Sequence, residues 1–158
     1  MITPNCIVME KDVHVGFYAR IEGVEIWNNK RFNPVIIFKK GVTVQQNLHL
    51  TCANYISIGR NTAIAANVTI TDIHHPYIDI DIPIEHQMIE VKEVVIGEEC
   101  KLYNNVVVLP GVHIGKHTTI GANSVVCHDI PDYSVAVGNP ARIIRQYDFE
   151  NKKWIKTY

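Results

Sequence analysis

The sequence lacks both a charge excess and a long apolar run, and each absence excludes a class of function. Its 158 residues carry 15 Lys and Arg against 16 Asp and Glu, a formal net charge of -1. Such a balance provides no positive field to hold a nucleic-acid backbone, so no nucleic-acid partner is expected. No stretch approaches the ~18 consecutive apolar residues of a membrane-spanning helix, so no transmembrane segment is expected either.

Cysteines and targeting signals are also sparse. The 4 cysteines lie far apart and form no Cys-x-x-Cys pair, so free thiols are expected. The residues after Met1 lack the basic and apolar stretches of a secretory signal peptide, which predicts a cytoplasmic protein. Hydrophobic residues make up 47% of the chain, enough for a core, and a length of 158 residues suits one domain.

What the sequence does contain is a repeat of six residues. Large aliphatic residues recur at this spacing at Ile96, Leu102, Val108, Ile114, Ile120 and Val126. A unit of six residues is too short for a hairpin and does not match the period of a helix, so we predict a β-solenoid. Three units would close one coil, which stacks residues about eighteen apart. The predicted pairs are Ile96 with Ile114, Leu102 with Ile120 and Val108 with Val126.

The same spacing extends towards the N-terminus. Ile58, Ile64 and Ile70 continue the aliphatic row, and Phe38, Val44 and Leu50 do so before a two-residue insertion. The sequence therefore predicts a single solenoid domain over residues 1–158. Its predicted parts are an N-terminal cap of short strands at 1–35, coils at 36–146 and a C-terminal tail at 147–158.

The repeat is interrupted after Ile70. The next aliphatic residue in phase, Ile96, lies 26 residues further on, which is not a multiple of six. Part of this segment must therefore leave the coil. The residues near 71–93 are rich in His, Asp and Pro, as expected for a projecting loop that carries functional groups on a rigid scaffold.

Five motifs, in order and spacing, make the sequence similar to the hexapeptide-repeat acetyltransferases. They are Gly59-Arg60-Asn61, Ile70-Thr71-Asp72-Ile73-His74-His75-Pro76, Leu109-Pro110-Gly111-Val112, Gly121-Ala122-Asn123-Ser124-Val125-Val126 and Gly138-Asn139-Pro140-Ala141-Arg142. The resemblance covers residues 36–146. It is strongest to the galactoside and maltose acetyltransferases and to the sugar O-acetyltransferases of surface-polysaccharide synthesis.

This resemblance implies a fold, an assembly and a reaction. The implied fold is an all-β, left-handed parallel β-helix with one projecting loop and a short C-terminal extension. The implied assembly is a homotrimer with active sites between subunits. The implied reaction moves an acetyl group from acetyl-CoA to a hydroxyl of a sugar or polysaccharide precursor, with no metal required.

The resemblance also implies that His75 is the catalytic base. A neutral imidazole can take the hydroxyl proton as the oxygen attacks the thioester, so no Ser or Cys nucleophile is needed. The adjacent His74 is a candidate substrate contact. Asp72 is a second candidate residue of the substrate site. Its carboxylate could accept the other imidazole N–H and fix the tautomer, or it could only form a turn. Gln45 aligns with an acceptor-binding Asn of the family, although an exposed amide at a corner is the alternative.

Donor-binding residues carry over from the same resemblance. Asn104, Gly111 and Ala122 match positions along the coil edge that hold CoA, although Gly and Ala also suit plain corners. Arg142 and Arg145 could meet the CoA phosphates, or be solvated surface charges. Tyr103 departs from the family pattern, because glycine is usual there.

Other interpretations stay open at this stage. A sugar-amine N-acetyltransferase and a streptogramin-type antibiotic acetyltransferase would share the scaffold. A γ-class carbonic anhydrase would need three zinc-binding histidines, and His113 and His117 do not reproduce its pattern. A catalytically silent β-helix could serve as an assembly scaffold or binding module.

Overall fold

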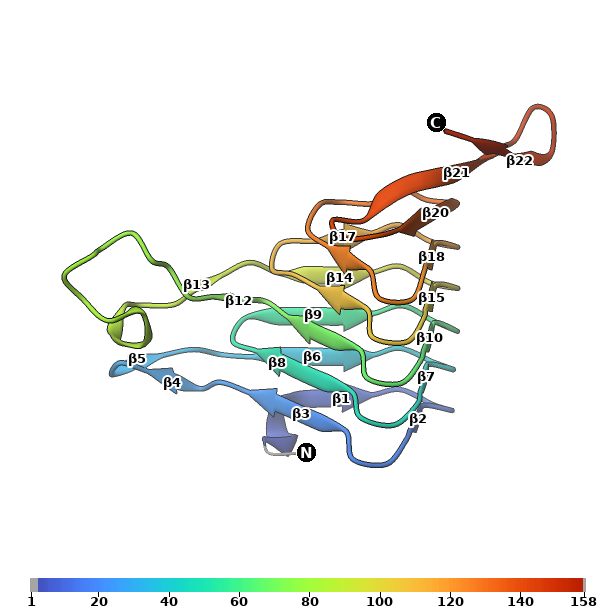
Figure 1. Cartoon of the computed structure of the whole chain (residues 1–158). Helices are drawn as coiled ribbons and strands as arrows, with labels where there is room; N and C mark the ends of the chain where they lie inside the picture. Colours follow the sequence, from blue (N-terminus) through green and yellow to red (C-terminus); the bar gives the residue numbers. More distant parts are fainter. Residues whose placement is uncertain (1–2, 158) are drawn as a thin grey trace.

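The computed structural model describes residues 3–157 and is built from three parallel sheets (Figure 1). The first sheet contains β1 (Ile7–Met9), β6 (Val35–Phe38), β9 (Tyr55–Ile58), β14 (Val94–Ile96) and β17 (His113–Ile114). The second begins with β2 (His14–Val15), β7 (Thr43–Val44), β10 (Ala63–Ile64), β15 (Lys101–Leu102) and β18 (Thr119–Ile120). The third contains β3 (Arg20–Gly23), β8 (His49–Cys52), β11 (Thr69–Thr71), β16 (Val107–Val108) and β19 (Val125–Val126).

The chain visits these sheets in the same order on every turn, so each turn adds one strand to each sheet. The second sheet is extended by β20 (Ser134–Val137), β21 (Arg142–Asp148) and β22 (Lys153–Lys156). Two hairpins leave the stack: β4 (Ile26–Trp27) with β5 (Lys30–Arg31), and β12 (Ile73–His74) with β13 (Glu90–Val91). The helices of residues 3–157 are single 3-10 turns, Pro4–Cys6 and Ile84–His86, too short to cross a membrane.

The register of the strands confirms the predicted stacking. Ile96 lies opposite Ile114, Leu102 opposite Ile120 and Val108 opposite Val126. All six side chains are buried, and they form the rows of the core with the corresponding residues of earlier turns. Because the residue two places before each of them also points inward, those positions are occupied by small or β-branched side chains.

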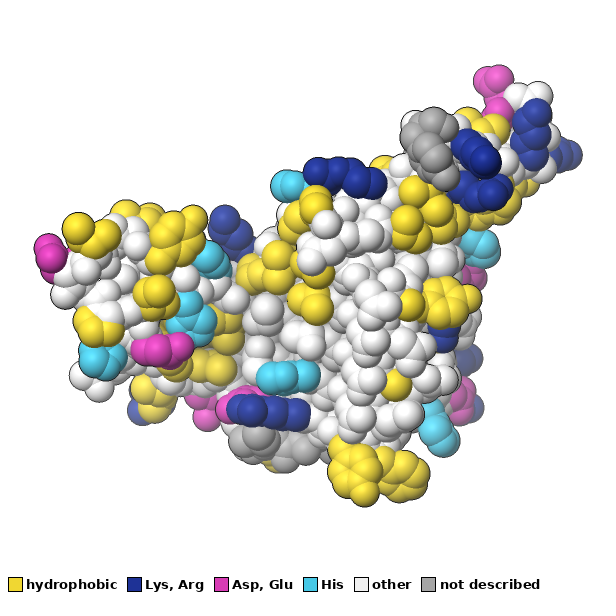
Figure 2. Space-filling view, in the orientation of Figure 1, with side chains coloured by type: hydrophobic (Ala, Val, Ile, Leu, Met, Phe, Trp, Pro, Cys, Tyr) yellow, Lys and Arg dark blue, Asp and Glu magenta, His cyan; other side chains and the backbone are white. Residues whose placement is uncertain are grey.

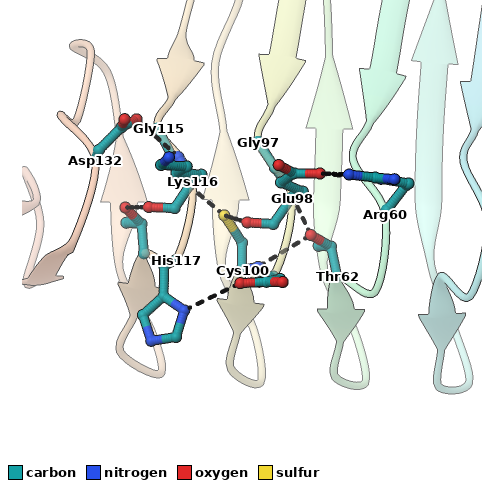
Figure 3. A network of polar contacts seen from close by, with 11 residues as sticks. Arg60, Thr62, Gly97, Glu98, Cys100, Gly115, Lys116, His117 and Asp132 are labelled. Atoms are coloured by element: carbon teal, nitrogen blue, oxygen red, sulfur yellow. Dashed lines mark hydrogen bonds and ion pairs between the residues drawn. The ribbon is translucent and has the colours of Figure 1, made fainter.

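The corners between sheets are held by polar side chains that reach the next turn. At the corner between the first and second sheets (Figure 3), Thr62 Oγ1 accepts the N–H of Cys100 at 3.0 Å and donates to the Gly97 carbonyl at 2.8 Å. The Cys100 thiol in turn donates to the Gly115 carbonyl at 3.1 Å. Buried polar groups at these corners are therefore paired with the backbone of a neighbouring turn.

The corner between the second and third sheets carries a ladder of asparagines. Asn47, Asn67, Asn105 and Asn123 each adopt a left-handed backbone conformation, with φ between 59° and 60°. Their side-chain amides hydrogen-bond from one turn to the next at 2.9 to 3.1 Å. Asparagine suits this position because it tolerates positive φ and its amide can both donate and accept.

Two predicted boundaries differ from the structure. Residues 7–23 contribute β1, β2 and β3 to the three sheets, so the coil begins well before residue 36. The inserted β4–β5 hairpin separates this first turn from the rest and breaks its phase with the later repeat. At the other end, residues 142–156 form an antiparallel hairpin on the second sheet.

Candidate active site

The outward face of the third sheet forms the floor of a cavity of about 450 Å³. Since side chains alternate along a strand, the residues between the buried ones point out into this space. They are Arg20 and Glu22 on β3, His49 and Thr51 on β8, and Thr69 and Thr71 on β11. The rim is completed by Trp27 from the β4–β5 hairpin and by Glu85 and Ile89 from the projecting loop.

His75 lies at the edge of this cavity, immediately after β12, and is half-buried. Its imidazole meets the Trp27 ring edge-on, with centroids 5.1 Å apart and planes inclined by 75°. Its Nδ1 is enclosed and makes no hydrogen bond with residues 3–157. The ring is thus positioned by packing, and Nδ1 is shielded from solvent.

Asp72 does not take the role expected of it. Its carboxylate is buried and accepts hydrogen bonds from the backbone N–H groups of Ala53, Asn54 and Tyr55 at 2.7 to 2.9 Å. The thiol of Cys52 also points to it, at 3.3 Å. These partners use both carboxylate oxygens, so the prediction of a substrate contact or of a partner for His75 is wrong. Asp72 instead fastens the base of the loop to the turn below.

His74 and His75 face opposite sides of the loop. His74 is exposed and packs edge-on against Tyr77, with centroids 6.2 Å apart. It lines a separate cavity of about 260 Å³, together with Lys92, Pro110 and Cys127. Within one chain, therefore, only His75 of this adjacent pair contributes to the cavity over the third sheet.

Comparison with known proteins places these features in a family. The bacterial transferase hexapeptide (six repeats) family matches residues 93–128. A protein described as a lipopolysaccharide biosynthesis O-acetyl transferase (WbbJ) from Escherichia coli is 41% identical over 129 residues, covering 77% of this chain and 66% of its own. A galactoside O-acetyltransferase from Lactococcus lactis is 38% identical over 157 residues, covering 99% of this chain and 66% of its own. The chain belongs to the hexapeptide-repeat acetyltransferases.

A solved acetyltransferase structure agrees with this assignment. The galactoside acetyltransferase in complex with coenzyme A aligns with a TM-score of 0.70 and 26% identity, over 98% of this chain and 73% of its own. The family relationship therefore extends over both the repeat and the projecting loop. The chain spans 66% of the length of the two curated relatives.

The residues that the hexapeptide-repeat pattern assigns to the donor are spread over three places in one chain. Asn104 and Ala122 lie exposed on neighbouring turns of the asparagine-ladder corner, where the Asn104 carbonyl accepts the N–H of Asn123 at 2.9 Å. Gly111, with φ of 81°, lies at another corner against the side chain of Lys92. Arg142 and Arg145 are exposed on β21. None of these residues lines the His75 cavity.

Gln45 is also outside that cavity. It is exposed on the turn between β7 and β8, and its backbone N–H donates to the Ile64 carbonyl at 2.9 Å. Sequence reasoning missed Arg20, Glu22 and Trp27, because these residues fall in the segment assigned to a cap. The signal for Trp27 was its place in a short alternating stretch, Val24-Glu25-Ile26-Trp27.

The two histidines considered for zinc are each placed against a glutamate. His113 Nε2 lies 3.4 Å from Glu93, and His117 Nδ1 lies 3.3 Å from Glu99. Among residues 3–157, no three or more His, Cys, Asp or Glu side chains are grouped so as to hold a metal ion.

Proposed function

We propose that this protein is an acetyl-CoA-dependent O-acetyltransferase that acts on a hydroxyl of a sugar or polysaccharide precursor. The observation that carries the proposal is the position of His75 beside a cavity that several polar side chains line, in a family whose relatives are named as O-acetyltransferases. Threonine hydroxyls, the Arg20–Glu22 pair and Glu85 offer both donors and acceptors to a polyhydroxylated ring. A cavity of about 450 Å³ suits a small ligand of this kind.

In the proposed reaction, His75 acts as general base. Because Nδ1 is enclosed, Nε2 is the nitrogen that takes the proton of the acceptor hydroxyl. The hydroxyl oxygen attacks the carbonyl carbon of the thioester, and the tetrahedral intermediate collapses by breaking the carbon–sulfur bond. The imidazolium then returns its proton to the CoA thiolate. The products are the acetyl ester and CoA, with no covalent enzyme intermediate and no metal in the proposed scheme.

The proposal includes the left-handed β-helix and the homotrimer of the family. The projecting loop supports the assembly, because it exposes large apolar side chains, with Ile78 80% and Ile80 92% exposed. Apolar surface gathered on one loop is typical of a protein interface. We assign donor binding to Asn104, Gly111, Ala122, Arg142 and Arg145, and propose that they complete the site with His75 of another subunit.

The test is release of free thiol from acetyl-CoA in the presence of galactosides, maltose, amino sugars and a streptogramin. We expect thiol release with a hydroxyl acceptor and a loss of about 10²–10⁴ in turnover for His75→Ala. His74→Ala is the matched control and should stay within about threefold, since its side chain faces away from the cavity.

Each alternative has its own outcome in this assay. Preference for an amino sugar or for the streptogramin would replace the O-acetyltransferase proposal with the corresponding enzyme. Thiol release with none of the acceptors would favour the scaffold interpretation. A His75→Ala enzyme within threefold of the parent would overturn the assigned base. We place the reaction in the cytoplasm, in keeping with the expectation from the sequence.

A further inference from the structure

After the last parallel strand, β20, the chain forms a two-stranded extension that projects from the stack of coils (Figure 1). The cross-strand pairs of β21 and β22 are Arg145 with Lys156, Gln146 with Ile155, Tyr147 with Trp154 and Asp148 with Lys153. Side chains alternate between the two faces of a strand, so the pairs that contain Arg145 and Tyr147 share one face. The pairs that contain Gln146 and Asp148 share the other.

The first of these faces carries a cluster of aromatic rings. Tyr147 contacts Trp154 and Phe149, with centroids 5.5 and 5.0 Å apart, and Phe149 contacts Tyr133 at 4.8 Å. The Nζ of Lys116 lies 5.2 Å from the centre of the Tyr133 ring. Phe149 is 62% exposed and Trp154 38%. We call these five side chains, with Arg145 and Lys156, the aromatic face.

The charges of the extension are mostly positive, although the whole chain has a net charge of -1. Residues 142–157 contain 5 Lys and Arg against 2 Asp and Glu, and Lys and Arg side chains gather on this projection in Figure 2. Asp148 points away from the aromatic face and accepts hydrogen bonds from the side chain and N–H of Asn151 and from the N–H of Glu150. The hydrogen bonds from Asn151 lower the pKa of Asp148.

We propose that the aromatic face binds the surface of an anionic lipid bilayer. Trp and Tyr rings favour the headgroup region, where the apolar ring is buried and its polar edge stays hydrated. Lys and Arg flanking such rings are attracted to anionic headgroups and can extend their apolar stems along the surface. The projection carries both kinds of side chain on one face, beyond the coils, where a flat surface can reach them.

A second copy of the chain fits this face less well. A two-fold contact between identical faces would place Arg145 and Lys156 of both copies in one interface, where like charges repel. An anionic surface reverses the sign of that interaction. The inference is tested on Trp154 and Lys156, which have no role in the proposed acetyl transfer and do not line the His75 cavity.

The test is flotation of the whole protein with vesicles of phosphatidylcholine, with or without about one third phosphatidylglycerol. We expect binding to the anionic vesicles only, and weaker binding as salt is raised, because salt screens the attraction. The chain contains 2 tryptophans, so a Trp27→Phe variant leaves Trp154 as the sole indole reporter. The fluorescence emission of Trp154 should shift to shorter wavelength when anionic vesicles are added.

Strand β22 supplies matched variants for the two faces. Trp154→Ala is paired with Ile155→Ala, since the two side chains are 38% and 40% exposed on opposite faces of one strand. Lys156→Gln is paired in the same way with Lys153→Gln. The aromatic-face variants should weaken vesicle binding about fivefold each, and their partners less than twofold. Thermal melting of all four variants checks that the fold is kept.

Several results would overturn the proposal. They are equal binding to neutral and anionic vesicles, equal loss with the paired variants, and no vesicle binding at all. Binding of a soluble acidic polysaccharide to this face, without vesicle binding, would assign the face to a different ligand. A smaller sedimenting species for Trp154→Ala in the absence of vesicles would show that a second copy covers the face.

Discussion

Trp27 packs edge-on against the imidazole of His75, with ring centroids 5.1 Å apart. The same side chain donates from Nε1 to the carbonyl of Gln87 at 3.1 Å, on the segment where the projecting loop returns. Its neighbour Asn28 donates to the carbonyl of His86 at 2.8 Å. The β4–β5 hairpin therefore holds the returning segment of the projecting loop by hydrogen bonds from Trp27 and Asn28. The Trp27 ring also positions His75, the candidate base.

We expect Trp27→Ala to lower the turnover number about tenfold, with a smaller change in the KM for acetyl-CoA. An edge-to-face contact is worth about 0.5–1.5 kcal/mol, and its loss lets the imidazole move away from the attack geometry. Trp27→Phe keeps an aromatic edge against His75 and should stay within about threefold. Steady-state thiol release measures both variants. A Trp27→Ala enzyme with parental turnover would show that the ring contact does not position His75.

The stacking of the coils could be predicted because the sequence encodes it directly. Ile96 and Ile114 lie opposite each other since the repeat spacing equals the length of one side of the coil. The first turn follows the same rule, with Met9, Val15 and Ile21 at six-residue steps. The sequence predicts a cap here because the inserted hairpin separates these three residues from the rest of the row.

The sequence also encodes the direction of the side chains at the start of the loop. Ile70 is buried, so alternation turns Asp72 inward and Thr71 and Ile73 outward. His75 continues the outward set, and all three outward residues line the cavity. The contribution of Trp27 could not be obtained this way, because its contact with His75 joins segments that are far apart in the sequence.

Because of the asparagine ladder, we expect alanine and glycine at position 67 to lower the free energy of unfolding by different amounts. Its side chain donates to Asn105 and accepts from Asn47, at φ of 60°. Asn67→Ala loses both hydrogen bonds and puts alanine, which tolerates the left-handed conformation less well than asparagine, at this position, which we expect to cost about 2 kcal/mol. Asn67→Gly loses only the hydrogen bonds and should recover about half of that loss. Urea unfolding compares the two, and an alanine variant as stable as the glycine variant would contradict the backbone part of this account.

The buried thiols predict that stability declines at alkaline pH. Burial, together with the carboxylate of Asp72, raises the pKa of Cys52 above its ordinary value of 9.0, and burial also raises the pKa of Cys100. Above about pH 9 the unfolded chain releases these protons while the folded chain keeps them, so unfolding becomes more favourable. The stabilisation is complete below that pH, and each thiol reduces it, by at most about 1.4 kcal/mol per pH unit, until the pH reaches the raised pKa of that thiol in the folded chain.

Unfolding in urea between about pH 8 and about pH 10 checks this expectation. Cys52→Ala removes one of the two thiols and should show a shallower decline than the parent. Cys127→Ala is the control, because its side chain is half-buried at the edge of a cavity. Parallel declines for the parent and Cys52→Ala would exclude the buried thiol as a cause.

The exposed loop predicts the behaviour of an assembly mutant. If Ile80, which is 92% exposed in the single chain, is buried between subunits, Ile80→Asp places an unpaired carboxylate in each interface. Burial of such a charge costs several kcal/mol, so we expect the trimer to dissociate and acetyl transfer to fall with it, while the coils keep their melting temperature. Phe17→Asp introduces the same charge at a side chain 82% exposed on the turn between β2 and β3, and should leave assembly and activity intact. Sedimentation velocity and thiol release measure the two variants side by side. A fully active Ile80→Asp trimer would show that the apolar tip of the loop lies outside the subunit interface.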